Sequence, residues 1–501
     1  MSEEPPRKRL RGSNLVNASD KVSNDQLLFF TAIKKNDTKS LSKFLENISS
    51  FKININFTSK NHTTALNLAI VANNYELVKR LIDLGANVNL RSLREHTRYV
   101  YYNRLPLHLA VHNGQKKIVE LLLQNNADVN SVEDHKTALS IAAEQNHFKI
   151  AKLLIDSGAE INPSNSVKPL FSAISRSTSM AEYFIKRGAD VNAVGKYWYD
   201  PQDIDTTALE LAIYRQNPAI MQLLIDKKAN VNYKSGQDTL LRIAVITGSV
   251  KAVKVLLNCD DISVNAVAAP GISALHVDYI TSFYKSNNTK NILTALLDAG
   301  IDVNQISYRG ENVVDYFKRM SLVIKKPVFQ HIVKLKAAGL YVCSDILEAV
   351  EGTEYASFYS ACCLEVQMMK ENKILDINFS FYDLLHKSQF VVALALLIVD
   401  QNKCLQERLL RRQFTLYGGL IYYRLKKAFY RKKLLVKVDE ILFDIFNAHL
   451  PDVIKRMIYL YLSKENMSRY YYLIDKRIDA KALVVIGWLN PKRSRDSALF
   501  K

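Results

Sequence analysis

Few residues of this 501-residue chain have the type and spacing that catalysis or metal binding needs. His108 and His112 lie four residues apart, which would place two imidazoles on one face of a helix, but no third ligand for a metal is evident. Cys362 and Cys363 are adjacent, so their side chains leave a helix in different directions and indicate structural thiols. The chain contains no glycine-rich phosphate loop, no His-Glu-x-x-His and no Gly-x-Ser-x-Gly sequence. We therefore expect no catalytic residue, no metal and no cofactor, and we do not expect an enzyme.

A recurring five-residue motif is the main feature of the rest of the sequence. It reads Gly-Ala-Asp-Val-Asn or a close variant and follows two short apolar helices, as in Thr64–Ala69 and Leu77–Ile82. Successive copies are 30 to 41 residues apart, and their final asparagines are Asn89, Asn130, Asn162, Asn192, Asn232, Asn265 and Asn304. This period predicts a solenoid, because one such unit cannot bury its apolar face alone whereas a stack of units can.

The repeats resemble those of the ankyrin family over residues 25–343. Leu105-Pro106-Leu107-His108 is very close to that family's Thr-Pro-Leu-His signature. The resemblance implies about eight to nine repeats, an all-α array that binds a target protein in a groove, and a His108 that hydrogen-bonds to backbone within the loops. The unit at about 165–192 is short and has no clear copy of the signature, and the unit at 310–340 is recognisable only in outline.

Two of the longest steps between repeats contain clusters of aromatic residues. In ankyrin proteins this stretch forms a β-hairpin finger beside the groove, so the resemblance implies that both clusters project from one face. Exposed tyrosine and tryptophan side chains anchor interfaces, which makes these rings candidate target-binding residues. The alternative is that they pack on neighbouring fingers. The candidates are Tyr99, Tyr101 and Tyr102 in the first cluster and Tyr197, Trp198 and Tyr199 in the second.

Composition favours a protein of the cytoplasm or the nucleus. The five cysteines are odd in number and show no Cys-x-x-Cys spacing, which argues for a reducing compartment. The first residues have no apolar core typical of a secretory signal, and the longest apolar run, Phe390–Val399, is about half of a bilayer crossing. We therefore expect no membrane insertion. In the polar tail 1–24, the residues Arg7, Lys8, Arg9 and Arg11 resemble a short nuclear-import signal.

The formal charge of +19 is concentrated in one region. Residues 401–437 contain 11 Lys and Arg but one acid, Glu407, and 424–433 has the spacing of a basic amphipathic helix. Such a helix can attract nucleic acid, an anionic membrane surface or an acidic partner. A solvated helix face explains the same pattern, and no nucleic-acid motif accompanies it, so we expect no nucleic-acid partner.

The repeat pattern stops beyond residue 343. The sequence predicts a second, helical domain over residues 344–490, followed by a basic tail, 491–501. Within it Leu450, Pro451, Ile454, Ile458 and Leu462 form a Leu-Pro stretch with apolar residues four apart on one helix face. This segment, 448–475, resembles the first helix of an F-box, and its place behind ankyrin repeats resembles the PRANC domain of poxvirus, insect and symbiont proteins. The resemblance implies that these five residues bind the Skp adaptor of a cullin-type ubiquitin ligase. A structural helix that closes the bundle is the alternative.

The sequence thus predicts an all-α protein, an ankyrin-repeat solenoid followed by a helical domain with an F-box-like helix. Its expected function is that of an adaptor, at most the substrate-receptor subunit of a ubiquitin ligase, in which the repeats bind a target protein and the F-box-like helix recruits Skp and cullin. The alternative is a scaffold or inhibitor that sequesters a signalling or transcription factor without any ligase.

Overall fold

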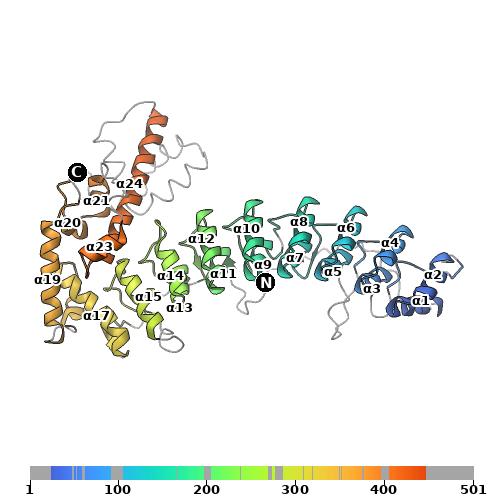
Figure 1. Cartoon of the computed structure of the whole chain (residues 1–501), viewed down its shortest axis with the longest axis horizontal. Coiled ribbons are helices and arrows are strands. Elements are labelled where there is room, and N and C mark those ends of the chain that lie inside the picture. The colour runs from blue at the N-terminus through green and yellow to red at the C-terminus, as the bar shows by residue number, and fades with distance from the viewer. Residues whose placement is uncertain are drawn as a thin grey trace, which may run out of the picture. The chain divides into compact units, whose positions relative to one another are not determined.

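The computed structural model describes most of the chain between residues 24 and 446 (Figure 1). The ranges that it leaves out are 1–23, 48–49, 52, 59–62, 92–104, 165, 197–204, 237, 269–272, 277–285, 308–309, 319, 349, 351–352, 375–376, 397–405 and 447–501. The chain divides into two compact units, Met1–Asp190 and Val191–Lys501. The division falls inside the region 25–343 that the sequence assigns to repeats, and the predicted domain boundaries stay predictions.

Unit 1 consists of helix pairs that follow one another along the chain, with the first helix of each pair packed on the first helix of the next (Figure 1). The pairs are α1 (Asn24–Lys35) with α2 (Thr38–Glu46), α3 (Ala65–Val71) with α4 (Tyr75–Asp83), α5 (Pro106–His112) with α6 (Lys116–Gln124), α7 (Ala138–Glu144) with α8 (Phe148–Asp156), and α9 (Pro169–Arg176) with α10 (Thr178–Lys186). One hairpin, β1 (Val132–Glu133) with β2 (Lys136–Thr137), precedes α7.

Unit 2 begins with repeat helices of the same kind and ends with a different arrangement. Its repeat helices are α11 (Ala208–Tyr214), α12 (Pro218–Asp226), α13 (Leu240–Ile246), α14 (Val250–Leu257), α15 (Ser286–Asp298), α16 (Val313–Lys318) and α17 (Leu322–Ala337). Two hairpins precede α11 and α13: β3 (Val194–Lys196) with β4 (Asp205–Thr207), and β5 (Lys234–Ser235) with β6 (Asp238–Thr239).

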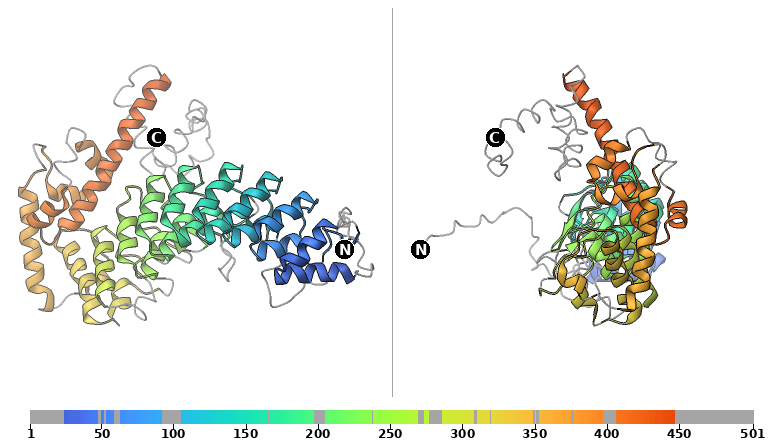
Figure 2. Two further views of the ribbon diagram at one scale, coloured as in Figure 1. Left: turned by 45° about the vertical axis from the view of Figure 1, so that its right-hand side comes forward. Right: turned by 90° about the vertical axis from the view of Figure 1, so that its left-hand side faces the viewer.

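A helical bundle completes unit 2. It contains α18 (Ser344–Glu348), the short 3₁₀ helix η2 (Thr353–Tyr355), α19 (Ala356–Glu371), α20 (Phe381–His386), α21 (Gln389–Ala395), α23 (Glu407–Gln413) and the 29-residue α24 (Gly418–Phe446), drawn in red-orange in Figure 2. Within the described residues, no helix is long and apolar enough to cross a membrane. The predicted fold class, all-α with a repeat solenoid, is confirmed, and the only sheets in the described part are the three two-stranded hairpins.

Short local signals fix where the repeat helices begin and end. Threonine side chains accept hydrogen bonds from the backbone at the start of α3, α7, α11 and α13, which satisfies N–H groups that have no partner within the helix. Gly85, at φ +87°, ends the α3–α4 pair in the left-handed conformation that glycine adopts without a steric penalty. In the first helices α3, α5, α7, α9, α11 and α13 an alanine is fully buried, Ala69, Ala110 and Ala142 among them, and lets neighbouring helices approach closely.

The recurring asparagine joins each repeat to the next. Its side-chain amide donates a hydrogen bond to a carbonyl of the motif in the next repeat. Its side-chain oxygen accepts a hydrogen bond from the backbone N–H two residues after that carbonyl. Asn130 donates to the carbonyl of Gly158 (3.2 Å) and accepts from the N–H of Glu160 (2.8 Å). The same pair of bonds recurs along each unit and ends at Asn304, which bonds to Tyr341 and Cys343. The asparagine that recurs in the sequence is therefore the link between repeats.

Candidate protein-interaction sites

The second aromatic cluster begins directly after a paired strand. Strands β3 and β4 are antiparallel, with Val194 opposite Thr207 and Lys196 opposite Asp205. The residues that connect them include Tyr197, Trp198 and Tyr199, which lie outside the described part of the chain. The predicted hairpin is therefore present at its base, and the role of the three rings stays a prediction.

The first aromatic cluster lies in a segment whose two ends meet at β1. At one end, the Arg91 side chain donates to the carbonyl of Val132 (3.1 Å) and lies 3.9 Å from the carboxylate of Glu133. At the other end, the backbone N–H of Leu105 donates to the same carboxylate (2.8 Å). The intervening residues, with Tyr99, Tyr101 and Tyr102, are not described. Glu133 thus fixes both ends of the insertion beside the hairpin of the next repeat.

Some exposed apolar side chains lie on the hairpins and on the last residues of the first helices. In unit 1 they are Val132 on β1 and Val71 at the end of α3, and in unit 2 they are Val194 on β3 and Tyr214 at the end of α11. Val132 and Val194 therefore offer a protein partner apolar contact area on two hairpins, each beside an aromatic insertion.

His108 has a structural role. Its ring is fully buried, and Nε2 lies 3.3 Å from the carbonyl oxygen of Lys136 on β2, so it ties α5 to the hairpin of the next repeat. This confirms the backbone hydrogen bond that the signature predicts. Within the described ranges, no three His, Cys, Asp or Glu side chains gather as metal ligands would.

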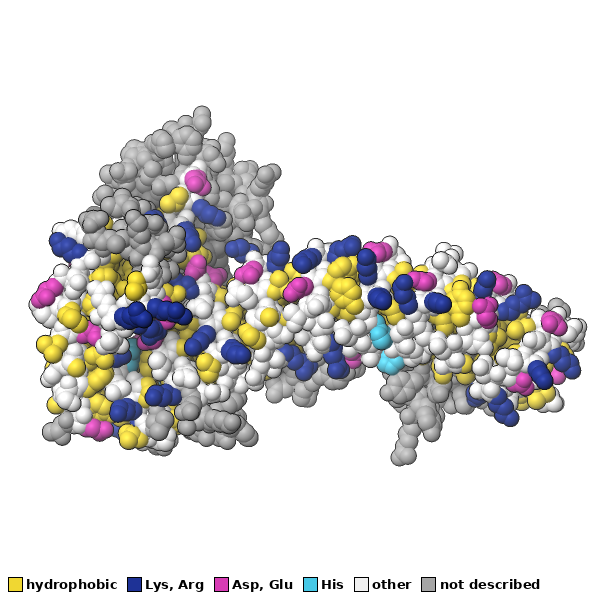
Figure 3. Space-filling model, in the orientation of Figure 1, with side chains coloured by type: hydrophobic (Ala, Val, Ile, Leu, Met, Phe, Trp, Pro, Cys, Tyr) yellow, Lys and Arg dark blue, Asp and Glu magenta, His cyan; other side chains and the backbone are white. Residues whose placement is uncertain are grey.

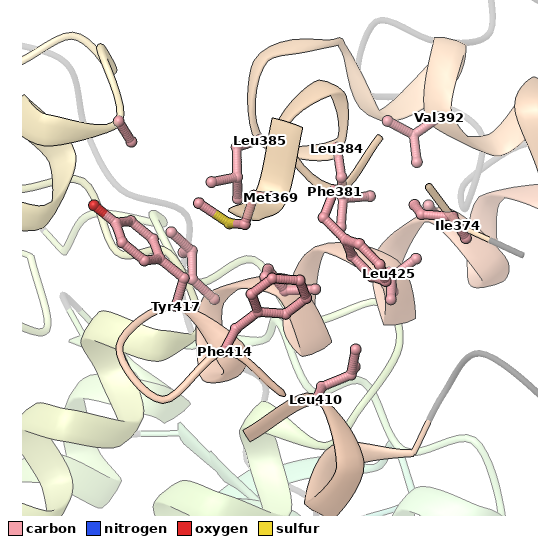
Figure 4. Packing of buried hydrophobic residues seen from close by; sticks show 14 of the residues in the cluster. Met369, Ile374, Phe381, Leu384, Leu385, Val392, Leu410, Phe414, Tyr417 and Leu425 are labelled. Carbon is pink, nitrogen blue, oxygen red and sulfur yellow. The ribbon is translucent and has the colours of Figure 1, made fainter. Parts of the chain in front are cut away.

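The candidate adaptor-binding residues follow the last described element. Helix α24 ends at Phe446, and Leu450, Pro451, Ile454, Ile458 and Leu462 lie beyond the described residues, as do Arg7, Lys8, Arg9 and Arg11. What the structure shows is the body that carries segment 448–475. Its core consists of α19, α20, α21, α23 and α24, with Phe381, Phe414 and Leu425 among the buried side chains (Figure 4).

A buried carboxylate on α19 holds the start of α24. Glu365 is 5% exposed and accepts hydrogen bonds from the backbone N–H groups of Leu416 (2.9 Å) and Tyr417 (2.8 Å) and from the hydroxyl of Thr415 (3.1 Å). These groups directly precede the helix, where the N–H dipoles favour a negative charge. The sequence contains no local signal for this contact, because 50 to 52 residues separate the partners.

Polar contacts also bind the bundle to the last repeats. Lys334 of α17 donates to the carbonyl of Leu416 (2.7 Å), and the Tyr417 hydroxyl donates to the carbonyl of Lys334 (2.6 Å). Burial lowers the pKa of the Lys334 amine, and the nearby Asp298 opposes that shift. Arg411 of α23 pairs with Asp298 of α15 at 2.9 Å. The bundle and the last repeats are therefore one packed body.

Two adjacent glycines make this close contact possible. A Cβ on Gly419 would lie 2.3 Å from the Asp298 carboxylate, and one on Gly418 would lie 2.7 Å from backbone atoms of Arg411 and Leu410. Sequence reasoning missed these residues, although a Gly-Gly pair at the start of a long helix was a signal for close backbone approach.

The basic region 401–437 is partly used inside the protein. Arg424 donates to the carbonyls of Leu384 (3.0 Å) and Leu385 at the end of α20, and burial lowers the pKa of its guanidinium. Lys426 donates to the carbonyl of Asn258. These cations satisfy carbonyls at helix ends, so neither a solvated face nor an anionic partner accounts for the whole cluster.

Comparison with known proteins identifies the repeats. Residues 29–133, 107–195 and 194–268 match the family described as ankyrin repeats (3 copies). The chain is 39% identical over 82 residues to the E3 ubiquitin-protein ligase KEG of Arabidopsis thaliana, a match that covers 16% of this chain but spans 5% of the ligase. It is 32% identical over 98 residues to Notch-regulated ankyrin repeat-containing protein A of Danio rerio, covering 20% of this chain and 80% of the relative. The crystal structure of the human ASB11 ankyrin repeat domain matches 52% of this chain and 96% of its own, at 20% identity and a TM-score of 0.34.

Proposed function

Since the chain belongs to the ankyrin-repeat family, whose repeats bind proteins, we propose that it is an adaptor that links a target protein to a ubiquitin ligase. The repeats would bind the target through the hairpins and their aromatic insertions, and segment 448–475 would bind the Skp adaptor and, through it, a cullin. The observation that carries this proposal is the regular repeat array with exposed apolar side chains on its hairpins and helix ends. The similarity to the E3 ubiquitin-protein ligase KEG supports the proposed link to a ubiquitin ligase.

The physical basis of the proposed activity is effective concentration. An adaptor that binds both a target and a ligase holds the target's lysines near the active subunit without any chemistry of its own. The contacts of Glu365, Lys334 and Arg411 make the bundle and the last repeats one body. Such a body would hold a target on these repeats at a fixed distance from α24, the helix that precedes segment 448–475 in the sequence.

Binding of purified Skp adaptor and cullin to the full-length chain tests the ligase half. We expect the wild-type chain to retain both proteins and the double variant Ile454→Glu/Ile458→Glu to lose them at least tenfold, because acidic side chains would replace the apolar stripe. The matched control is Leu364→Glu, the same kind of change at a residue of α19 that is 72% exposed. Thermal unfolding of each variant shows whether it is folded.

Three results contradict the ligase half of the proposal. Absence of binding by folded wild-type protein would leave a scaffold or inhibitor without a ligase. Loss of folding in the double variant would assign the stripe to the core of the bundle. Equal loss of binding in the Leu364→Glu control would show that the effect is not specific to segment 448–475.

We also propose import into the nucleus through Arg7, Lys8, Arg9 and Arg11. Replacing these four residues by alanine in a fluorescent fusion should leave the fusion in the cytoplasm.

A further inference from the structure

The second helices α8 and α10 of unit 1 carry two aromatic rings in contact, one exposed and one half-buried. Phe148, the first residue of α8, is 39% exposed, and its ring centroid lies 5.2 Å from that of Tyr183 on α10. The guanidinium of Arg187 lies 5.2 Å from the Tyr183 ring centroid. The residue corresponding to Phe148 is Lys116 in α6 and Thr178 in α10. An apolar ring thus stands where the neighbouring helices begin with polar residues.

Basic residues flank these rings on both helices, together with the acids Asp156 and Glu182. Lys149, Lys152 and Lys186 are exposed, and none of them forms an ion pair in the described part of the chain. Arg187 lies 3.8 Å from Asp156, so its charge is partly balanced. Figure 3 shows hydrophobic side chains over α8 and α10 with a border in which Lys and Arg outnumber Asp and Glu. An aromatic centre with a charged, solvated rim is the arrangement of a protein-binding surface.

We propose that this surface, Phe148, Lys149, Lys152, Tyr183 and Lys186, binds an acidic segment of another protein. An apolar side chain of that segment would pack on the two rings, and its carboxylates would pair with the three lysines. The site consists of residues on second helices of unit 1 and includes neither the hairpins nor segment 448–475, so it goes beyond the proposed function and does not depend on it.

Charge identifies the occupant as a different protein. The chain's own ends are basic, with five Lys and Arg against three acids in 1–23 and eleven against five in 447–501. A second copy of the chain carries the same net charge of +19, and like charges oppose association. Only a partner of opposite charge is attracted to the three lysines, and this attraction weakens as salt screens the charges.

A random peptide library displayed on phage tests the proposal. The library is selected on the full-length chain and on two full-length variants: Lys149→Glu/Lys152→Glu/Lys186→Glu, and a control, Lys79→Glu/Arg80→Glu, which reverses two exposed charges on α4. We expect a set of peptides that binds wild type and control but binds the triple variant about tenfold more weakly. That set should be acidic and contain a Phe, Leu or Trp, and its binding should weaken with salt.

A single change at the apolar centre completes the test. Phe148→Ala removes one ring at a partly exposed position, and we expect the same peptides to bind about tenfold more weakly while thermal unfolding of the chain is unchanged. The proposal is wrong if the selection enriches no acidic peptide. It is also wrong if the peptides bind the folded triple variant as tightly as the wild-type chain. Peptides that bind at the hairpins would tolerate all these substitutions, and so failure here leaves the target site of the proposed function untouched.

Discussion

Glu365 is a single side chain that joins two helices of the bundle, because its buried carboxylate accepts from Thr415, Leu416 and Tyr417. Glu365→Ala leaves those donors without an acceptor, and we expect the free energy of unfolding of unit 2 to fall by about 3 kcal/mol. Hydrogen exchange on the full-length chain should show faster exchange in peptides from α24 and no change in unit 1. Glu371→Ala, an exposed acid on α19, is the control, and unchanged exchange in α24 of the Glu365 variant would refute this role.

The residues that sequence reasoning could identify are those with local signals. His108 belongs to a four-residue signature, and its bond to Lys136 is confirmed. Glu365 and the pair between Arg411 and Asp298 carry no such signal, because these partners lie 50 or more residues apart and only folding brings them together. The predicted aromatic and adaptor-binding residues lie outside the described part, so their roles are still predictions.

At the scale of elements, the start of α24 depends on its two glycines. A methyl group on Gly418 would meet backbone atoms of α23, which have little freedom to move, whereas one on Gly419 would meet the end of the Asp298 side chain, which can turn away. We therefore expect Gly418→Ala to lower the melting temperature of unit 2 more than Gly419→Ala does. Gly419→Ala should mainly break the pair between Asp298 and Arg411. Differential scanning calorimetry of the full-length variants measures both, and the reverse order would contradict this packing.

The repeat helices were predictable because each repeat is encoded within about 30 residues by alanine, leucine and, in several units, a capping threonine. The short unit at 165–192 was harder, because Lys168-Pro169-Leu170-Phe171 preserves only the central Pro-Leu of the signature. The structure nevertheless begins α9 at Pro169, in the same way that α5 begins at Pro106. The elements of the bundle lack any repeat, so their pairing could not be read from the sequence.

At the scale of the whole molecule, the bundle shares its core with the last repeats. Ala338 belongs to the buried cluster of the bundle, and Ala337 and Leu340 pack against it. Asp298 and Lys334 add polar contacts from α15 and α17. A cut at residue 343, where the repeat pattern ends in the sequence, would expose this surface and leave Arg411 without the Asp298 carboxylate.

We therefore expect residues 344–501 alone to be expanded and prone to aggregation, whereas residues 191–501 should fold, because a repeat array tolerates a cut between repeats. Size-exclusion chromatography and circular dichroism distinguish the two outcomes, and hydrogen exchange of α24 in each fragment can be compared with the full-length chain. Full-length rates of exchange in the 344–501 fragment would show that the bundle folds without the repeats. The distance between a target on the last repeats and segment 448–475 would then be set by a flexible connection, because the contacts of Asp298 and Lys334 would not be needed to hold the bundle.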